Sequence, residues 1–415
     1  MPRLLTSVYA WVIVIIASLA FAMEFASMNI LNIINQDLTV RFHLTDTRLG
    51  WFSATYFIAN VLFIPVSGIL LDKFSAKWLL VLSVILSVVG ISFLGYAPFW
   101  LAVLLRFVSG ACNPLTILGA MRIAYNWLPS ARWGLASSLV VSLGMLGGLA
   151  SQDPLAYLLQ NIEWQQALLW FLLVGVVIAI LMMVIVRESP KALFNVLHQQ
   201  REKLNIVAGV KHVVGNLQNW RAGLFTAGMN TPVNLLGGLW GVAYVMAAFH
   251  VSHFQATLMM SVLFVGAAIG GIVLGLASDL LHRRKVVCIL SALVTLALLA
   301  YLMLGQSADM AALEVIVFCL GFLSSAQDLS YAVASESSAP QYTGMSIAMI
   351  ALAVQASGLI FQPLSGYLID LTHPVAGQLV FANFNYFIWI FPAMALLALI
   401  MALWMKETHC QRTWD

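Results

Sequence analysis

Long apolar runs separated by short polar breaks are the feature that most limits how this chain can fold. Most of these runs exceed the roughly 20 residues that a helix needs to cross a bilayer. Only 8% of the 415 residues are charged and 62% are hydrophobic, whereas soluble domains are about one quarter charged. The sequence therefore predicts an all-α integral membrane protein with twelve transmembrane helices, near residues 8–35, 48–71, 77–97, 99–124, 133–158, 165–187, 221–248, 255–279, 286–304, 311–337, 342–369 and 384–405.

One extended polar stretch divides these runs into two groups of six. Gly68 and Asp72 of the first group recur as Gly275 and Asp279 of the second, both displaced by 207 residues (275 − 68 and 279 − 72). A shared offset indicates a duplicated six-helix unit, so we expect two bundles in a pseudo-two-fold arrangement. The predicted parts are an N-terminal bundle, a cytoplasmic linker and a C-terminal bundle, over residues 1–187, 188–220 and 221–415.

The basic residues of the predicted loops gather on one side of the membrane. If the N-terminus is cytoplasmic, the outer loops carry only Arg41 and Arg48, and the inner loops carry most of the remaining Lys and Arg. The positive-inside rule then predicts that both termini are cytoplasmic. A formal net charge of +3 leaves no basic surface for a nucleic acid.

Motifs for catalysis, metal binding or nucleotide binding are missing from the sequence. The cysteines, Cys112, Cys288, Cys319 and Cys410, form no CxxC pair and no cluster with histidine at metal-ligand spacing. Phosphate-binding loops, nucleophile elbows, HExxH and Rossmann glycine patterns are also absent. We therefore expect no enzyme activity, no metal and no cofactor.

Four charged residues fall within the predicted membrane helices, namely Glu24, Arg106, Asp153 and Asp328. A charge at this depth is costly and commonly marks an ion pathway or a substrate site. We expect these residues to couple proton and substrate, with Glu24 as the first candidate for either ligand. A static pair between Glu24 and Arg106 is the alternative, and Asp153 could equally face water because it precedes Pro154 near a helix end.

Amide and aromatic side chains in the predicted helices are candidates for solute binding. On the seventh helix, Pro232 and the pair Gly237–Gly238 predict a broken segment. The alternative is that such side chains join helices to one another or lie in interfacial belts. The candidates are Asn29, Asn32, Asn113, Asn230, Asn234, Trp240, Tyr244, Gln327, Tyr331, Gln355, Gln362, Asn385 and Trp389.

The loop after the second predicted helix resembles a signature of the major facilitator superfamily, Gly-x-x-x-Asp-Arg/Lys-x-Gly-x-Arg/Lys. It reads here as Gly68, Asp72, Lys73 and Lys77, with Ser75 in place of the second glycine. The second-half copy consists of Gly275, Asp279, Arg283 and Arg284. Glycine would let a neighbouring helix approach, while the charges would cap helix ends. The resemblance implies that these residues latch the outward-facing state, and simple positive-inside anchors are the alternative.

The sequence Arg106-Phe-Val-Ser-Gly110 is similar to a second motif of the same family, Arg-x-x-x-Gly. In family members this arginine braces the first helix and tunes a carboxylate that binds a proton. The resemblance covers the whole chain and implies two six-helix bundles that work by alternating access.

The resemblance also implies a function, which we expect to be proton-coupled import of a small polar organic solute. An amino acid, a nucleoside or an organic anion would suit such a symporter. The fifth helix lacks the Gly-Pro spacing of drug/proton antiporters, which favours uptake. A proton-driven efflux antiporter for amphipathic compounds or a siderophore carrier is the alternative, and a transporter-like sensor is a more distant one.

The chain has an acid in the first helix, short loops and no antiporter glycine pattern. In these respects it is also similar to bacterial nutrient-uptake members of the family, including phagosomal amino-acid and nucleoside carriers. This finer resemblance implies a multi-pass protein of the bacterial cytoplasmic (inner) membrane that works as a monomer. Its expected partners are a small-molecule substrate, the proton and the lipid bilayer.

Overall fold

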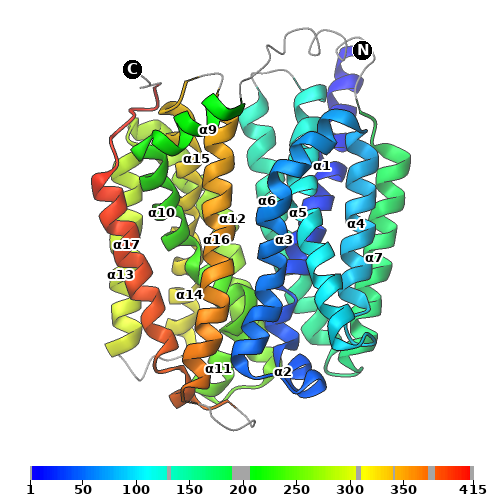
Figure 1. Cartoon of the computed structure of the whole chain (residues 1–415), viewed down its shortest axis with the longest axis vertical. Coiled ribbons are helices and arrows are strands. Elements are labelled where there is room, and N and C mark those ends of the chain that lie inside the picture. The colour runs from blue at the N-terminus through cyan, green and yellow to red at the C-terminus, as the bar shows by residue number, and fades with distance from the viewer. Residues whose placement is uncertain are drawn as a thin grey trace. The chain divides into compact units, whose positions relative to one another are not determined.

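The computed structural model describes residues 2–128, 132–188, 206–304, 310–339, 342–372 and 379–411. In these ranges every regular element is a helix, as the sequence predicts. The chain divides into two compact units, which are considered separately below (Figure 1). Unit 1 contains Met1–His43 and Thr55–Glu202, and unit 2 contains Leu44–Ala54 and Lys203–Asp415.

Unit 1 is built from long helices joined by short turns. One of them, α3, begins in unit 2 and continues through unit 1. The elements are α1 (Pro2–Asn29), α2 (Leu31–Phe42), α3 (Asp46–Lys73), α4 (Ala76–Ser92), α5 (Phe99–Trp127), α6 (Trp133–Leu158) and α7 (Trp164–Ile185). The sequence predicts a single helix over 8–35, but the structure interrupts it at Ile30 and extends α2 to Phe42.

Unit 2 contains shorter helical pieces. The first, α9 (Ile206–Gly215), lies within the stretch that we expected to be a linker. The others are α10 (Leu217–Pro232), η2 (Val233–Trp240), α11 (Gly241–Phe249), α12 (His253–Leu281), α13 (Arg284–Leu304), α14 (Met310–Ser324), η3 (Ser325–Asp328), α15 (Leu329–Glu336), α16 (Thr343–Asp370), η5 (Phe381–Phe384), η6 (Phe387–Trp389) and α17 (Ile390–Trp404).

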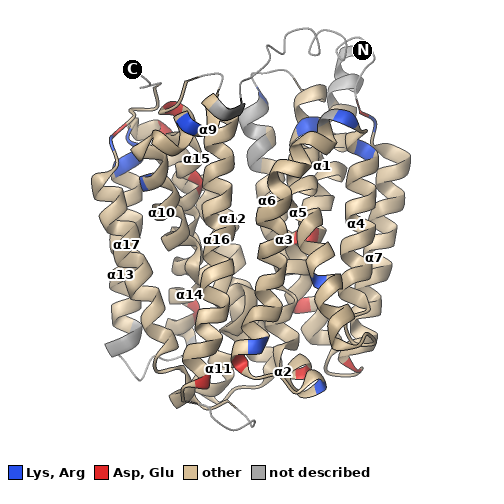
Figure 2. Cartoon of the chain, viewed as in Figure 1, with Lys and Arg blue, Asp and Glu red and all other residues tan. Residues whose placement is uncertain are grey.

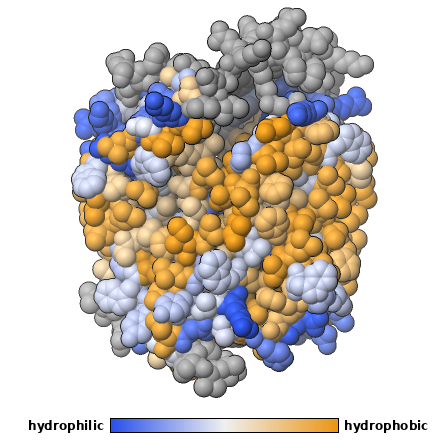
Figure 3. Space-filling view, in the orientation of Figure 1, coloured by the Kyte–Doolittle hydropathy of each residue, from blue (hydrophilic) through white to orange (hydrophobic). Residues whose placement is uncertain are grey.

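Ten of the described helical stretches are long and apolar enough to cross a membrane. Each of the twelve predicted apolar runs falls on a helix or on consecutive helical pieces, so the predicted fold class is confirmed. Figure 2 shows most charged residues near helix ends, and Figure 3 shows hydrophobic side chains over the middle of the visible face. This distribution is expected of helices whose middle sections contact lipid.

Two glycines let helices of unit 1 pack backbone against backbone. A Cβ at Gly147 of α6 would lie 2.1 Å from the carbonyl oxygen of Ala22 in α1, and one at Gly110 of α5 would lie 2.1 Å from that of Tyr56 in α3. Contacts this close leave no room for a side chain. Gly147 thus allows α6 to pack closely on α1.

Two helices of unit 2 change their hydrogen-bond pattern partway along. The break predicted at Pro232 and Gly237–Gly238 is confirmed, since α10 passes into the π-helix η2 before α11 begins. A second interruption is the 3-10 turn η3, which separates α14 from α15 and ends at Asp328. Such departures from α-geometry are frequent at functional sites.

Candidate functional site

Arg106 is fully buried in unit 1, where it caps the end of α1. Its Nη1 donates to the carbonyl oxygen of Ser27 (2.9 Å), and its Nη2 donates to that of Met28 (3.1 Å). These carbonyls belong to the last turn of α1, where no helical N–H can reach them. The guanidinium also lies over the Tyr56 ring, 4.7 Å from its centroid. Arg106 therefore supplies both hydrogen bonds and positive charge to the negative end of a broken helix.

Glu24 lies one turn before this cap in α1 and is 1% exposed. Ser87 of α4, Tyr56 of α3 and Arg106 of α5 surround its carboxylate. Within the described residues, neither carboxylate oxygen is in hydrogen-bond geometry, although the hydroxyls of Ser87, Tyr56 and Ser109 lie near enough to stabilise its charge. No ion pair joins Glu24 to Arg106 among the described residues, and both Nη atoms of Arg106 bind backbone carbonyls.

Short polar side chains form a small network beside Glu24. The Ser87 hydroxyl donates to Ser27 Oγ (3.1 Å) and shares a hydrogen bond with Ser109 Oγ (2.9 Å). A hydroxyl can rotate to donate to a carboxylate instead, so this network can respond to the charge of Glu24. Asn113, a predicted solute ligand, accepts a hydrogen bond from Asn60 Nδ2 (2.7 Å) and thereby joins α5 to α3.

The remaining candidates of unit 1 lie along α1, α2 and α6. Asn29 and Asn32 are buried, and Asn29 Nδ2 donates to the carbonyl oxygen of Phe25 (2.7 Å). Asp153 is half-buried in α6, directly before Pro154. The side chain of Asn29 therefore serves its own helix, and the roles of Asn32 and Asp153 stay predictions.

In unit 2, side chains of α16 satisfy the π-helical segment. Asn234 Nδ2 donates to Ser357 Oγ (2.8 Å), and Gln362 Nε2 donates to the backbone oxygen of Asn234 (3.1 Å). Trp240 Nε1 donates to Ser365 Oγ (2.8 Å). A π-helix displaces carbonyls from their usual partners, and Gln362 replaces one of those partners. Three candidates, Asn234, Gln362 and Trp240, thus hold η2 and α16 together.

Asn230 of α10 lies between two residues that form hydrogen bonds to other helices, and its own side chain forms neither bond. Thr226, one turn earlier in α10, donates to the backbone oxygen of Gln327 in η3 (3.4 Å), and Asn234, one turn later, is held by α16. Residues four apart share a helix face, so Asn230 lies between η3 and α16. Its side chain has no hydrogen-bond partner in the described part of the chain, and neither do Gln327 Oε1 and Gln355 Oε1.

Asp328 ends the 3-10 turn η3 and is half-buried. Its Oδ2 would lie 3.3 Å from a Cβ at Gly271 of α12. Tyr331 is close enough to Asp328 for an electrostatic interaction. The missing side chain at Gly271 leaves room for the carboxylate against α12. Asp328 thus belongs to the same broken region as Gln327.

Three aromatic or polar candidates lie at one end of unit 2. The Tyr244 ring packs edge-on against Phe384, with centroids 5.5 Å apart. Asn385 is exposed, and Trp389 is 63% exposed in an apolar groove that Tyr386 also lines. The exposure of Asn385 and Trp389 does not support a role in solute binding. It agrees with the alternative reading of these residues as part of an interfacial belt.

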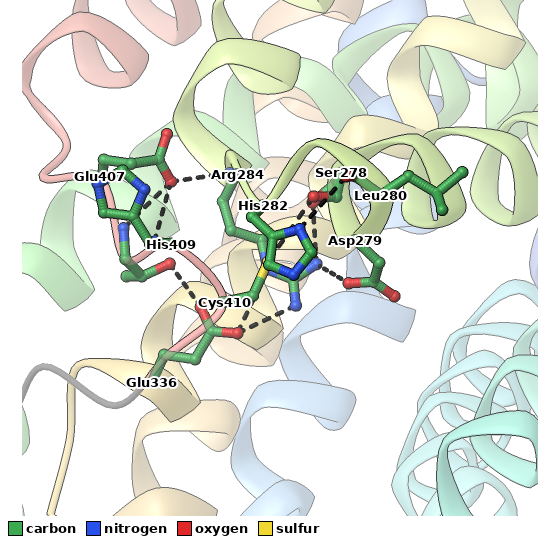
Figure 4. Close-up of polar contacts among 10 residues, drawn as sticks. Ser278, Asp279, Leu280, His282, Arg284, Glu336, Glu407, His409 and Cys410 are labelled. Carbon is green, nitrogen blue, oxygen red and sulfur yellow. Dashed lines mark hydrogen bonds and ion pairs between the residues drawn. The ribbon is translucent and has the colours of Figure 1, made fainter.

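Arg284 is the centre of a charged cluster at the other end of unit 2 (Figure 4). Its Nη1 lies 2.7 Å from Asp279 Oδ1 and its Nη2 lies 3.0 Å from Glu336 Oε1. The Glu407 carboxylate, from the segment after α17, accepts from the N–H groups of Arg284 (2.8 Å) and Lys285 (3.0 Å). Glu407 therefore caps the start of α13.

The two copies of the loop signature differ in their surroundings. In unit 1, Lys77 Nζ donates to the carbonyl oxygen of Met183 (2.7 Å) and Lys73 is exposed, while the side chain of Asp72 lies outside the described residues. A Cβ at Gly68 or Gly275 would meet nothing within 4 Å. The expected close approach of a helix at these glycines is therefore wrong for this structure. Arg283 is exposed, and the ion pairs to Asp279 and Glu336 are made by Arg284.

Sequence reasoning missed several residues of these sites. Tyr56 and Asn60 lie four residues apart in an apolar run, a spacing that could have indicated a polar face on α3. Ser87 and Ser109 carry no such signal, because serine in any helix can bond to the carbonyl four residues earlier. Glu407 lies beyond the last apolar run, where nothing indicates a capping role.

Comparison with known proteins places this geometry in a family. The model of the Major Facilitator Superfamily matches residues 14–233 and 222–412. The probable galactarate/D-glucarate transporter GudP of Escherichia coli K12 is 21% identical over 98% of this chain and 97% of its own length. Its namesake in Bacillus subtilis 168 is 22% identical over 90% of this chain and 89% of that protein.

Solved structures agree on the fold. A D-xylose–proton symporter matches 98% of this chain and all of its own with a TM-score of 0.74 and 17% identity. The nucleoside transporter NupG covers 95% of this chain and 98% of its own with a TM-score of 0.73 and 15% identity. The chain therefore belongs to the Major Facilitator Superfamily of membrane transporters.

Proposed function

We propose that this transporter is a proton-coupled symporter that imports a small organic anion of the sugar-acid type. The observation that carries the proposal is the buried Glu24 carboxylate, which has no hydrogen-bond partner among the described residues. A buried ionised carboxylate without donors costs several kcal/mol, and protonation removes that cost. Glu24 can therefore take up a proton from one side of the membrane and release it to the other.

Arg106 supports this role by its position. Its two Nη atoms are engaged by the carbonyls of Ser27 and Met28, so its charge stays near Glu24 without neutralising it through a direct bond. When Glu24 is protonated, the positive charge of Arg106 is left without a nearby counter-charge, and an anionic solute can supply it. Binding of proton and anion would then favour each other.

The substrate class follows from two further points. Both curated relatives that align along nearly the whole chain bear the name of probable galactarate/D-glucarate transporters. The amides of Asn230, Gln327 and Gln355 in unit 2 retain donors or acceptors that no described residue uses. Amides both donate and accept, which suits the hydroxyl groups of a sugar acid.

Transport by purified protein in liposomes tests the proposal. We expect D-glucarate or galactarate to enter against its gradient when the inside is more alkaline, with proton influx that depends on the solute. Amino acids, nucleosides and a cationic dye serve as competing probes. Uptake of one of those solutes alone would contradict the substrate class, and proton release driven by the dye would contradict symport in favour of efflux.

The Glu24→Gln variant tests the coupling residue. It keeps the shape of the side chain and removes its titration, so we expect exchange of solute across the membrane to continue while gradient-driven accumulation stops. Accumulation equal to that of the parent protein would contradict the role of Glu24. The matched control is Glu407→Gln, which makes the same change at a carboxylate that caps α13 outside the candidate site. It should leave gradient-driven accumulation unchanged.

A further inference from the structure

The first residues of α3 form a structural element of their own. The helix runs from Asp46 to Lys73, but its start belongs to unit 2 through the segment Leu44–Ala54, and the rest belongs to unit 1. A continuous helix that is shared in this way transmits any change in the arrangement of the units to that segment. The contacts that hold Leu44–Ala54 within unit 2 are therefore informative about the transport cycle.

Asp370, the last residue of α16, holds this helix start. Its Oδ1 accepts from the N–H of Asp46 (2.9 Å), its Oδ2 accepts from the N–H of Thr47 (2.8 Å), and the Thr47 hydroxyl donates to Oδ2 as well. The local residue Thr45 caps only the N–H of Arg48 (3.3 Å). N–H groups at a helix start have no helical acceptor, and a carboxylate there also meets the positive end of the dipole.

The same segment also packs on α16 through two glycines. A Cβ at Gly50 would lie 2.5 Å from the carbonyl oxygen of Gln362, and one at Gly366 would lie 2.2 Å from that of Asp46. The backbones of α3 and α16 therefore touch directly along one line. At these two glycines the contact is made by backbone, whereas Asp370 adds hydrogen bonds that are specific to the start of α3.

We propose that Asp370 is a releasable cap that tethers the start of α3 to unit 2, and that the transport cycle opens it. Transporters of this kind work by moving one half against the other around a fixed site. When the units move, the segment Leu44–Ala54 must leave α16 or α3 must bend. Release leaves the N–H groups of Asp46 and Thr47 and the carboxylate of Asp370 to water, which replaces their hydrogen bonds. The proposal depends on neither the substrate nor proton coupling.

Two measurements on the full chain in lipid nanodiscs test the cap. Hydrogen–deuterium exchange reads the amides of Asp46 and Thr47 directly. A Ser53→Cys reporter reads separation, because Ser53 is fully buried and lies one turn after Gly50 on the same face of α3. Its reaction with a membrane-impermeant maleimide is followed on the peptide that contains it, so the native cysteines do not interfere.

We expect Asp370→Ala to speed both deuterium exchange at these amides and labelling of the cysteine, each by about tenfold, which corresponds to ~1.4 kcal/mol. Thr47→Val, which removes only the hydroxyl donor, should act in the same direction with a smaller effect. The matched control is Glu407→Ala, since Glu407 caps α13 in the same way but holds no part of α3. It should leave the labelling of the cysteine unchanged.

Each outcome decides the proposal. Faster exchange of the amides with unchanged labelling would mean that Asp370 is a local cap that never opens the contact, and the proposal would be wrong. Unchanged exchange would mean that the cap does not hold α3 at all. If Asp370→Ala does not fold, Asp370→Asn and Thr47→Val carry the same test, because both keep the size of the side chain.

Discussion

The polar regions of the two units differ in the kind of side chain whose hydrogen bonds are left open, although both units contain buried polar atoms without a partner among the described residues. In unit 1, the buried acid Glu24 lies beside a small network of hydroxyls and close to Arg106, which binds the backbone carbonyls at the end of the interrupted helix α1. In unit 2, the interrupted helices η2 and η3 carry amides, several of which have acceptors that no described residue uses. The open group of unit 1 is thus a titratable acid and those of unit 2 include neutral amides, which suits the proposed roles in proton coupling and solute binding.

The largest effect is expected from Arg106→Ala in unit 1. The change leaves the carbonyls of Ser27 and Met28 uncapped and the charge of Glu24 without compensation, and removal of one buried charge typically costs about 3–5 kcal/mol. Thermal unfolding in detergent should show a large drop in melting temperature. In a Glu24→Gln background the drop should shrink, because no charge is left uncompensated there. Equal drops in both backgrounds would mean that the two charges do not interact.

The second prediction compares the acids of the two units. With one proton per solute and a clamped membrane potential, a pH difference of one unit supports about tenfold accumulation. Glu24→Gln should lower this ratio to one, whereas Asp328→Asn should leave it near the parent value. Measurement of D-glucarate in liposomes at equilibrium gives the ratio. Loss of accumulation in Asp328→Asn alone would place coupling in unit 2 and reverse the comparison.

The third prediction compares two amides of unit 2. Asn230→Ala should weaken solute binding about fivefold, roughly 1 kcal/mol for one lost hydrogen bond, and should leave the melting temperature unchanged because no described residue bonds to this side chain. Asn234→Ala should instead lower the melting temperature, since it breaks the bond to Ser357. Binding is read by isothermal titration with D-glucarate. The opposite pattern would show that Asn234, not Asn230, contacts the solute.

The smallest effect is expected from Gly275→Ala. Because a Cβ at this position meets nothing within 4 Å, the free energy of unfolding should change by less than about 0.5 kcal/mol. Gly147→Ala in unit 1 is the comparison, and it should lower the melting temperature strongly because its Cβ would overlap Ala22. A large change in transport by Gly275→Ala with unchanged stability would show that this glycine is contacted in another state, as a latch requires.

Much of the fold could be predicted because a membrane-spanning helix is recognisable from its own stretch of sequence. Apolar length marks each span, and Pro232 with Gly237–Gly238 marked the break that became η2. The candidate acids could be found because a charge inside an apolar run is rare.

Other features could not be predicted, since they depend on residues far apart in the chain. The family resemblance implies that Arg106 braces the first helix, but the atoms that it binds, the carbonyls of the last turn of α1, are partners that every helix end offers and no sequence pattern marks. The caps by Asp370 and Glu407 join residues more than 120 positions apart. Gly68 and Gly275 matched a motif, yet neither lies against a neighbouring helix.

By itself, the sequence determined that the chain is a helical membrane protein built from two related halves and that very few charges lie within the membrane. These properties follow from hydrophobic length and from the cost of burying charge, both of which are local. Only the tertiary structure decided which polar groups are satisfied. It buried Glu24 beside hydroxyls that are not in hydrogen-bond geometry with it, bound Arg106 to backbone carbonyls and placed Asp370 on the start of α3. These outcomes depend on the tertiary structure because hydrogen bonds between helices depend on where the helices meet.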